Sequence, residues 1–67
     1  MIIEGNVERA KIFGSYCAII LDVGNDYVRA LAYTDFPLME GEKIRLEGHY
    51  RQRDDVNEFF SRVLKKC

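Results

Sequence analysis

Aromatic and cationic side chains recur at alternate positions between residues 27 and 33. If this segment is extended, Tyr27, Arg29 and Tyr33 share one face, because successive side chains of a strand point to opposite sides. Tyr16 and Ile20 of the preceding apolar run add to the same face, which predicts an exposed aromatic and apolar patch. Such patches usually bind a partner. The alternative is the opposite pleat, which would bury the tyrosines and expose alanines.

The sequence lacks the residue combinations that enzymes use. His49 has no serine near it in sequence, and a lone histidine is more typical of a surface than of a base or a ligand. The adjacent Asp54 and Asp55 suit a turn better than acid–base work. There is no Gly-rich phosphate loop and no Cys/His spacing typical of zinc. We therefore expect no enzyme, no cofactor and no metal.

Length and charge limit the function classes. The 67 residues allow one domain, spanning residues 1–67, with a modest core. Ten basic residues face eleven acidic ones, which gives a formal net charge of −1. This balance does not favour nucleic-acid binding through bulk charge. Any such binding requires the cations to gather on one face.

The cysteines and the apolar segments indicate in which cellular compartment the protein is expected. Cys17 lies in an apolar run and is typical of a small core residue, whereas Cys67 is expected to be a free thiol. A Cys17–Cys67 disulfide is the disfavoured alternative, so a reducing compartment is expected. Glu4 interrupts the only apolar residues at the N-terminus, and no run approaches the roughly 18 residues of a membrane span. We expect a cytoplasmic protein without a membrane partner.

Four segments are predicted to be strands. The segment 41–50 has the clearest alternation, with Ile44 and Leu46 facing the core and Tyr50 as a third candidate. Gly5 and Gly48 interrupt two of the strands, and a glycine inside a strand usually marks a bulge or a bend. Bent strands favour a small closed barrel over a flat sheet. The predicted strands are 1–11, 16–23, 27–33 and 41–50.

Turns separate these strands. The Gly24-Asn25-Asp26 sequence is the strongest hairpin signal, and 13–15 forms a shorter turn. Pro37 excludes a continuous helix or central strand from the 34–40 connection. We expect Phe36, Leu38 and Met39 in this connection to plug one end of the barrel.

The C-terminal segment has two interpretations. Apolar residues at 56, 59, 60, 63 and 64 follow the spacing of an amphipathic helix, with Asp54 or Asp55 as its N-cap. However, four strands do not easily close a barrel, and an open edge would need cover. A hairpin at 53–55 would return a fifth strand beside the fourth. We predict this strand, and keep four strands plus a C-terminal amphipathic helix as the alternative.

This order of elements resembles a minimal OB-fold of the nucleic-acid-binding class, like replication-protein-A-like and anticodon-binding domains. In that class the fourth strand commonly begins with the Gly-acid-x-hydrophobic pattern that Gly41, Glu42 and Ile44 show here. The resemblance implies an all-β fold, a small five-stranded OB-like barrel. The sequence departs from the class in its slightly acidic net charge. It also leaves no room for a helix between strands three and four.

The resemblance also implies a site for single-stranded DNA or RNA. Such domains use the face of strands two and three with the adjoining loops, where bases stack on aromatic rings and cations follow the phosphates. We place Lys11 and Phe13 in the loop after strand one, and Arg51 and Arg53 in the loop after strand four. The predicted nucleic-acid-binding residues are Lys11, Phe13, Tyr16, Tyr27, Arg29, Tyr33, Arg51 and Arg53.

Each part of this site has a simpler interpretation. The tyrosines can be amphipathic packing at barrel edges, and the two arginines can be a solvated turn that Asp54 and Asp55 partly neutralise. The patch can equally bury against a protein partner or a second copy in a homodimer, and the near-zero net charge fits that alternative.

Overall fold

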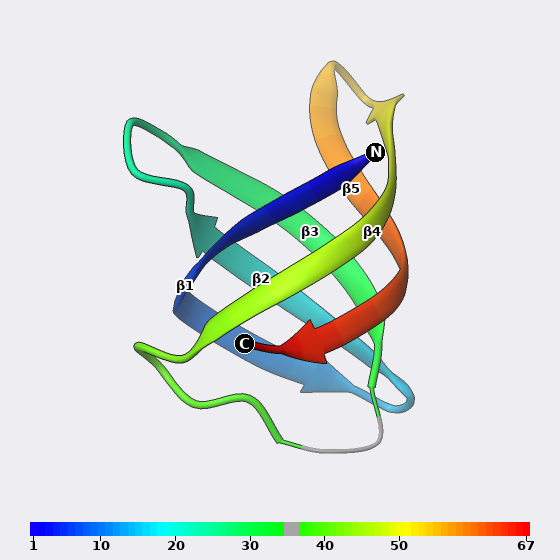
Figure 1. Cartoon of the computed structure of the whole chain (residues 1–67). Coiled ribbons are helices and arrows are strands. Elements are labelled where there is room, and N and C mark those ends of the chain that lie inside the picture. Colours follow the sequence, from blue (N-terminus) through cyan, green and yellow to red (C-terminus); the bar gives the residue numbers. More distant parts are fainter. Residues whose placement is uncertain (35–36) are drawn as a thin grey trace.

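The computed structural model is a closed five-stranded barrel with the strand order β1-β2-β3-β5-β4 (Figure 1). It describes residues 1–34 and 37–67, without the side chain of Arg53, and no helix occurs among them. The predicted all-β, OB-like barrel is therefore confirmed, and the helix alternative for the C-terminal segment is wrong. The strands are β1 (Ile2–Phe13), β2 (Tyr16–Asp22), β3 (Tyr27–Tyr33), β4 (Lys43–Arg53) and β5 (Val56–Lys66).

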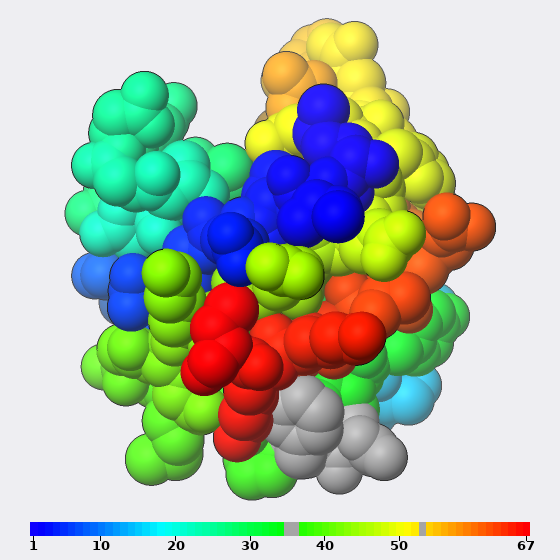
Figure 2. All heavy atoms as spheres, in the orientation of Figure 1, coloured from blue at the N-terminus to red at the C-terminus, as the bar shows by residue number. Residues whose placement is uncertain are grey.

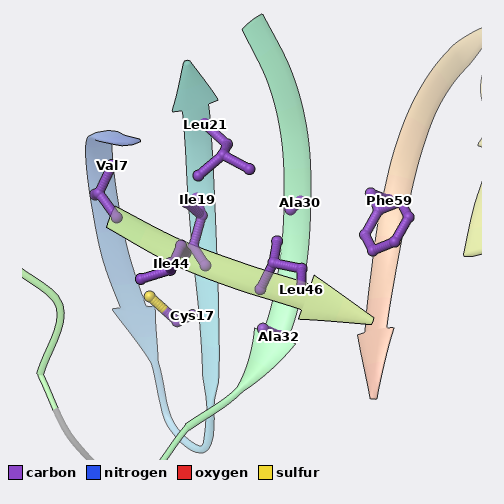
Figure 3. Packing of buried hydrophobic residues seen from close by; sticks show 9 residues of the cluster. All are labelled: Val7, Cys17, Ile19, Leu21, Ala30, Ala32, Ile44, Leu46 and Phe59. Atoms are coloured by element: carbon purple, nitrogen blue, oxygen red, sulfur yellow. The ribbon is translucent and has the colours of Figure 1, made fainter. Parts of the chain in front are cut away.

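The barrel interior is filled by one face of each strand (Figure 3). Small residues on β3, Ala30 and Ala32, leave room for the ring of Phe59, which is fully buried. Cys17 is also buried, as predicted, and both cysteines are free thiols. The core consists of Val7, Cys17, Ile19, Leu21, Ala30, Ala32, Ile44, Leu46 and Phe59.

A bulge in β5 explains why this strand resembles a helix in sequence. Glu47 pairs with Val63 and Gly48 pairs with Ser61, so Arg62 is the extra residue. The bulge reverses the pleat, and as a result Phe59 and Leu64 both point inward although they are five positions apart. The hydroxyl of the buried Ser61 donates to the Val63 carbonyl at 2.7 Å and ties the bulge together.

Gly5 and Gly48 are required by close backbone contacts. A Cβ atom at Gly48 would lie 2.0 Å from the carbonyl oxygen of Phe60, and one at Gly5 would lie 2.3 Å from that of Asp22. No side chain fits at either place. The predicted irregularity at Gly48 is confirmed by the register shift between Glu47 and Gly48. The extra residue of this bulge lies on β5, and Gly48 belongs to the strand opposite it.

The β4–β5 hairpin is tighter than predicted. Arg53 pairs with Val56, so the turn consists of Asp54 and Asp55 alone. Both have positive φ, 50° and 64°, which is the backbone of a type I′ turn. The predicted hairpin is therefore present, but the prediction that Arg51 and Arg53 lie in its loop is wrong, because a two-residue turn of this type matches the strand twist and lets the ladder continue to Arg53.

Two other expectations need correction. β1 continues to Phe13, and only Gly14 and Ser15 form the turn before β2. In the 34–40 connection, Leu38 packs against the core as expected, but Met39 is 65% exposed and plugs nothing. Phe36, the third predicted plug, lies outside the described residues. Tyr50 packs edge-on against Phe59 with ring centroids 5.1 Å apart and remains 44% exposed.

Candidate nucleic-acid interface

The outer face of β2 and β3, here called the β2–β3 wall, carries the predicted patch. Tyr16, Ile20 and Tyr33 point outward from it, whereas Ile19 and Ala30 are buried on the opposite face. The predicted pleat is confirmed, because the alternation in both strands is uninterrupted. Paired positions place the outward residues in rows: Tyr16 with Tyr33, Ala18 with Leu31, Ile20 with Arg29, and Asp22 with Tyr27.

Three rings form a row across the end of this wall. Phe13 pairs with Tyr16 and Tyr16 pairs with Tyr33, so all three share a face, and each is exposed. We call Phe13, Tyr16 and Tyr33 the aromatic row. The Tyr16 and Tyr33 ring centroids are 4.4 Å apart, and the Tyr33 hydroxyl donates to that of Tyr16 at 2.5 Å. This hydrogen bond raises the pKa of Tyr33.

A second bulge brings Phe13 and Lys11 to this wall. Val7 pairs with Leu21 and Arg9 pairs with Ile20, so Glu8 is the extra residue. Without the bulge, Lys11 and Phe13 would share the inward face of Val7. With it they point outward, and the Lys11 ammonium lies 5.2 Å from the centroid of the Phe13 ring. Both residues belong to β1, so their predicted place in a loop is wrong.

Tyr27 lies far from the aromatic row. It is six positions away from Tyr33 along β3, which is about 20 Å of extended chain. Its Cα partner is Asp22, and its backbone N–H donates to the carboxylate of Asp26 at 2.8 Å. Arg29 lies between the two ends of the wall. The structure thus places Tyr27 on the predicted wall but in acidic surroundings, apart from the other rings.

Arg51 belongs to β4 and not to a loop, which corrects the prediction. Its guanidinium group lies 5.1 Å from the ring centroid of Phe60, and the His49 ring lies 6.2 Å from the same ring. Arg53 also belongs to β4, and its side chain lies outside the described residues. Because β5 runs parallel to β3, the β4–β5 hairpin lies at the Tyr27 end of the wall, away from the aromatic row (Figure 1).

The sequence prediction missed Phe60. This residue pairs with Leu31 of β3 and with His49 of β4, so it continues the outer wall beyond β3. It is half-buried under Arg51. The adjacent pair Phe59 and Phe60 indicates that one of these rings is on the outer wall, because two successive residues of a strand lie on opposite faces. A fifth strand therefore puts one of the two rings outside.

Neither a cluster of metal-ligating side chains nor a membrane-spanning helix occurs in the described part of the chain. There, no three His, Cys, Asp or Glu side chains come together as they would around a metal ion. None of the described segments forms a helix that is long and apolar enough to cross a membrane.

Comparison with known proteins shows a likeness in fold. No protein-family model matches the sequence, and no curated protein gives a significant match to it. A solved structure of the S. pombe Stn1-Ten1 complex contains a similar chain, with a TM-score of 0.82 at 13% sequence identity. The match covers 98% of this chain and 56% of that chain. With its closed barrel of five strands, the present chain is a minimal OB-fold.

Proposed function

We propose that the β2–β3 wall binds single-stranded nucleic acid, with bases stacked on the aromatic row and phosphates held by neighbouring cations. The aromatic row is the observation that carries this proposal. Stacking on an aromatic ring contributes about 1–3 kcal/mol per base and needs only a π-face, so it fits a strand of any sequence. In this proposal the protein is a binding module of the cytoplasm and not an enzyme.

The geometry supports stacking because the rings are held in place before any ligand arrives. Tyr16 and Tyr33 are joined by their hydroxyl groups, and Lys11 lies over Phe13. Rings that are already ordered lose little entropy on binding. A ring whose only role was packing would not need to be exposed, whereas Tyr33 is 51% exposed.

The cations of this wall complete the site. Lys11 lies at the aromatic row, Arg29 in the middle of the wall and Arg51 beyond β3. Three phosphate contacts would give a slope of about −2 in a plot of log affinity against log salt, at roughly 0.7 per phosphate for single strands. The net charge of −1 supplies no bulk attraction to a polyanion, so in this proposal the affinity comes from these cations and the aromatic row.

The experiment is a titration of fluorescent oligo-dT and oligo-U at low salt, followed by a salt series. The proposal predicts saturable binding that weakens with added salt, and a loss of affinity in Tyr33→Ala. Val63→Ala, a similar truncation of an exposed side chain of β5, is the matched control and should bind normally. Absence of binding at high micromolar protein overturns the proposal.

A protein interface on the same wall is the second candidate. Ile20 and Leu31 are half-buried apolar residues between the tyrosines, and the S. pombe protein of similar fold is part of a two-protein complex. Bound to a partner or to a second copy, the wall would bury these side chains together with the aromatic row. Sedimentation of the free protein as a dimer that Leu31→Lys dissociates, without oligonucleotide binding, would favour this candidate.

A further inference from the structure

The opposite side of the barrel has a second surface, formed by the first half of β1, the first half of β4 and the last residues of β5. These three segments meet on the face toward the viewer in Figure 2, in blue, yellow-green and red. The strand register arranges its outward side chains in three rows, and we call this surface the β1–β4–β5 wall. The rows are Ile2, Glu47 and Val63; Glu4, Arg45 and Lys65; and Asn6 and Lys43 with Cys67 beside them.

Two of the cations on this wall, Lys43 and Lys65, form no close ion pair with a described carboxylate, although the charge of Lys43 contributes to lowering the pKa of Glu4. Arg45 donates to Glu4 at 3.1 Å, and the carboxylate of Glu42 holds Lys66 at 3.0 Å. Lys43 and Lys65 make no side-chain hydrogen bond or ion pair within residues 1–34 and 37–67. A shallow hollow of about 300 Å³ lies between them, lined by Glu4, Lys43, Arg45, Lys65, Lys66 and Cys67.

Apolar side chains are exposed at the other end of the wall. Ile2 is 57% exposed and Val63 is 40% exposed, because the bulge at Arg62 turns Val63 outward. A smaller hollow of about 70 Å³ lies between them and shares Arg45 and Lys65 with the first hollow. Along its strands the wall therefore presents first an apolar contact surface, at Ile2 and Val63, and then a cationic one, at Lys65 and Lys43.

This combination suits a peptide better than a nucleic acid. The described residues of the wall include no aromatic side chain on which a base could stack. The carboxylates of Glu4 and Glu47 interrupt any track of phosphates. A peptide can supply an apolar side chain for one hollow and carboxylates for the ammonium groups of Lys43 and Lys65.

We propose that the β1–β4–β5 wall binds an extended, acidic segment of a partner protein. Successive rows of the wall are two residues apart on β4, about 6.6 Å, which is the spacing between alternate side chains of an extended peptide. A segment lying along the wall thus places an apolar side chain at Ile2 and Val63. Carboxylates two and four positions later then meet Lys65 and Lys43.

The test uses a fluorescein-labelled synthetic peptide, Ser-Thr-Leu-Thr-Asp-Thr-Glu-Thr-Ser, in anisotropy titrations with the full chain. Binding should weaken with salt, and a peptide with Asn and Gln in place of its acids should bind at least tenfold more weakly. The double substitution Lys43→Glu, Lys65→Glu should also reduce affinity at least tenfold. Arg9→Glu with Arg29→Glu makes the same change in charge on the rest of the barrel and should leave peptide affinity unchanged.

Oligo-dT binding separates this inference from the proposed function. The Lys43→Glu, Lys65→Glu variant should bind oligo-dT like the unmodified chain, and its unfolding temperature should be unchanged because both side chains are exposed. If the charge reversal disturbs folding, Lys43→Gln with Lys65→Gln replaces it. Equal binding of the neutral peptide, no binding of the acidic one, or loss of oligo-dT affinity in the charge-reversed variant overturns the inference.

Discussion

The hydroxyl of Tyr33 donates a hydrogen bond to the hydroxyl of Tyr16 across the β2–β3 pair, with the two ring centroids 4.4 Å apart. This contact lies on the outside of the barrel, so it adds nothing to the core. It fixes the orientation of two exposed rings, which would otherwise rotate freely at their strand ends. The pair is therefore a ready-made surface for a flat ligand.

Removing the ring and removing the hydroxyl should have different effects. Tyr33→Ala should weaken oligo-dT or oligo-U binding by roughly 5- to 150-fold, the equivalent of about 1–3 kcal/mol of lost stacking. Tyr33→Phe keeps the ring and loses only the hydrogen bond, so its affinity should fall much less. Fluorescence anisotropy measures both. An equal loss in the two variants would show that the hydroxyl contacts the ligand directly.

The same hydrogen bond predicts a pH effect on the free protein. The bond to Tyr16 raises the pKa of Tyr33 above its usual value of 10.0. A group whose pKa is raised by folding stabilises the fold fully below its unfolded pKa, and that contribution disappears as the pH rises through the folded value. Ultraviolet titration of the phenolates should show a late transition that moves to lower pH in Tyr16→Phe. A titration curve that Tyr16→Phe leaves unchanged would contradict the contact.

Glu42 predicts an effect at acid pH. The N–H of Met39 donates to its carboxylate at 2.6 Å, and this bond, followed by the contact with Lys66, lowers the pKa of Glu42 below 4.5. The stabilisation is therefore complete above the unfolded pKa and is lost as the pH falls through the folded value. Thermal melts between pH 3 and 6 should show a weaker acid dependence in Glu42→Gln. Glu40→Gln makes the same charge change at an exposed neighbour and should retain the wild-type dependence.

Gly48 should tolerate no side chain. In Gly48→Ala the new Cβ would collide with the carbonyl oxygen of Phe60, so the β4–β5 ladder must open at the bulge. Overpacking costs typically about 1–3 kcal/mol, and a backbone contact yields less readily than a side chain, so we expect a loss at the upper end or beyond. Urea unfolding measures it. His49→Ala, at the next position, is the control and should change the free energy of unfolding far less.

The β4–β5 turn can be improved. Asp54 and Asp55 both hold positive φ, where Asn-Gly is the favoured pair. The double substitution Asp54→Asn, Asp55→Gly should stabilise the fold by about 1 kcal/mol, which raises the unfolding temperature by roughly 4–8 °C in a domain of this size. Asp54→Ala with Asp55→Ala should have the opposite sign, since alanine disfavours this backbone. A calorimetric scan that ranks the two variants the other way would exclude a type I′ turn.

The sequence predicts the parts of the fold in which alternation is unbroken. β2 and β3 keep a period of two from Tyr16 to Tyr33, so the buried and exposed faces of both strands could be assigned correctly. The fifth strand could be inferred only from the need to close the barrel. Its local pattern resembles a helix, because one extra residue, Arg62, moves an apolar position to the other face.

The candidate site could be predicted only in part for the same reason. A bulge is a change in register between two strands, and the register depends on the partner strand. Nothing near Glu8 in sequence reveals that Lys11 and Phe13 turn outward there. Likewise, the charged residues before the two aspartates predict a loop at Arg51, whereas the two-residue turn keeps Arg51 in β4.

The parallel pairing of β3 with β5 closes the barrel through only three residue pairs, Ala30 with Phe59, Leu31 with Phe60 and Ala32 with Ser61. The β1–β2, β2–β3 and β4–β5 ladders join neighbours along the chain, whereas this seam joins segments about thirty residues apart and the β1–β4 ladder joins segments about forty residues apart. Loop-closure entropy delays such pairings, so the hairpins should form first and these two seams last. In native-state hydrogen exchange, the amides of β4 and β5 that face one another should then outlast those along the two seams, which makes the seams the places where this barrel first opens.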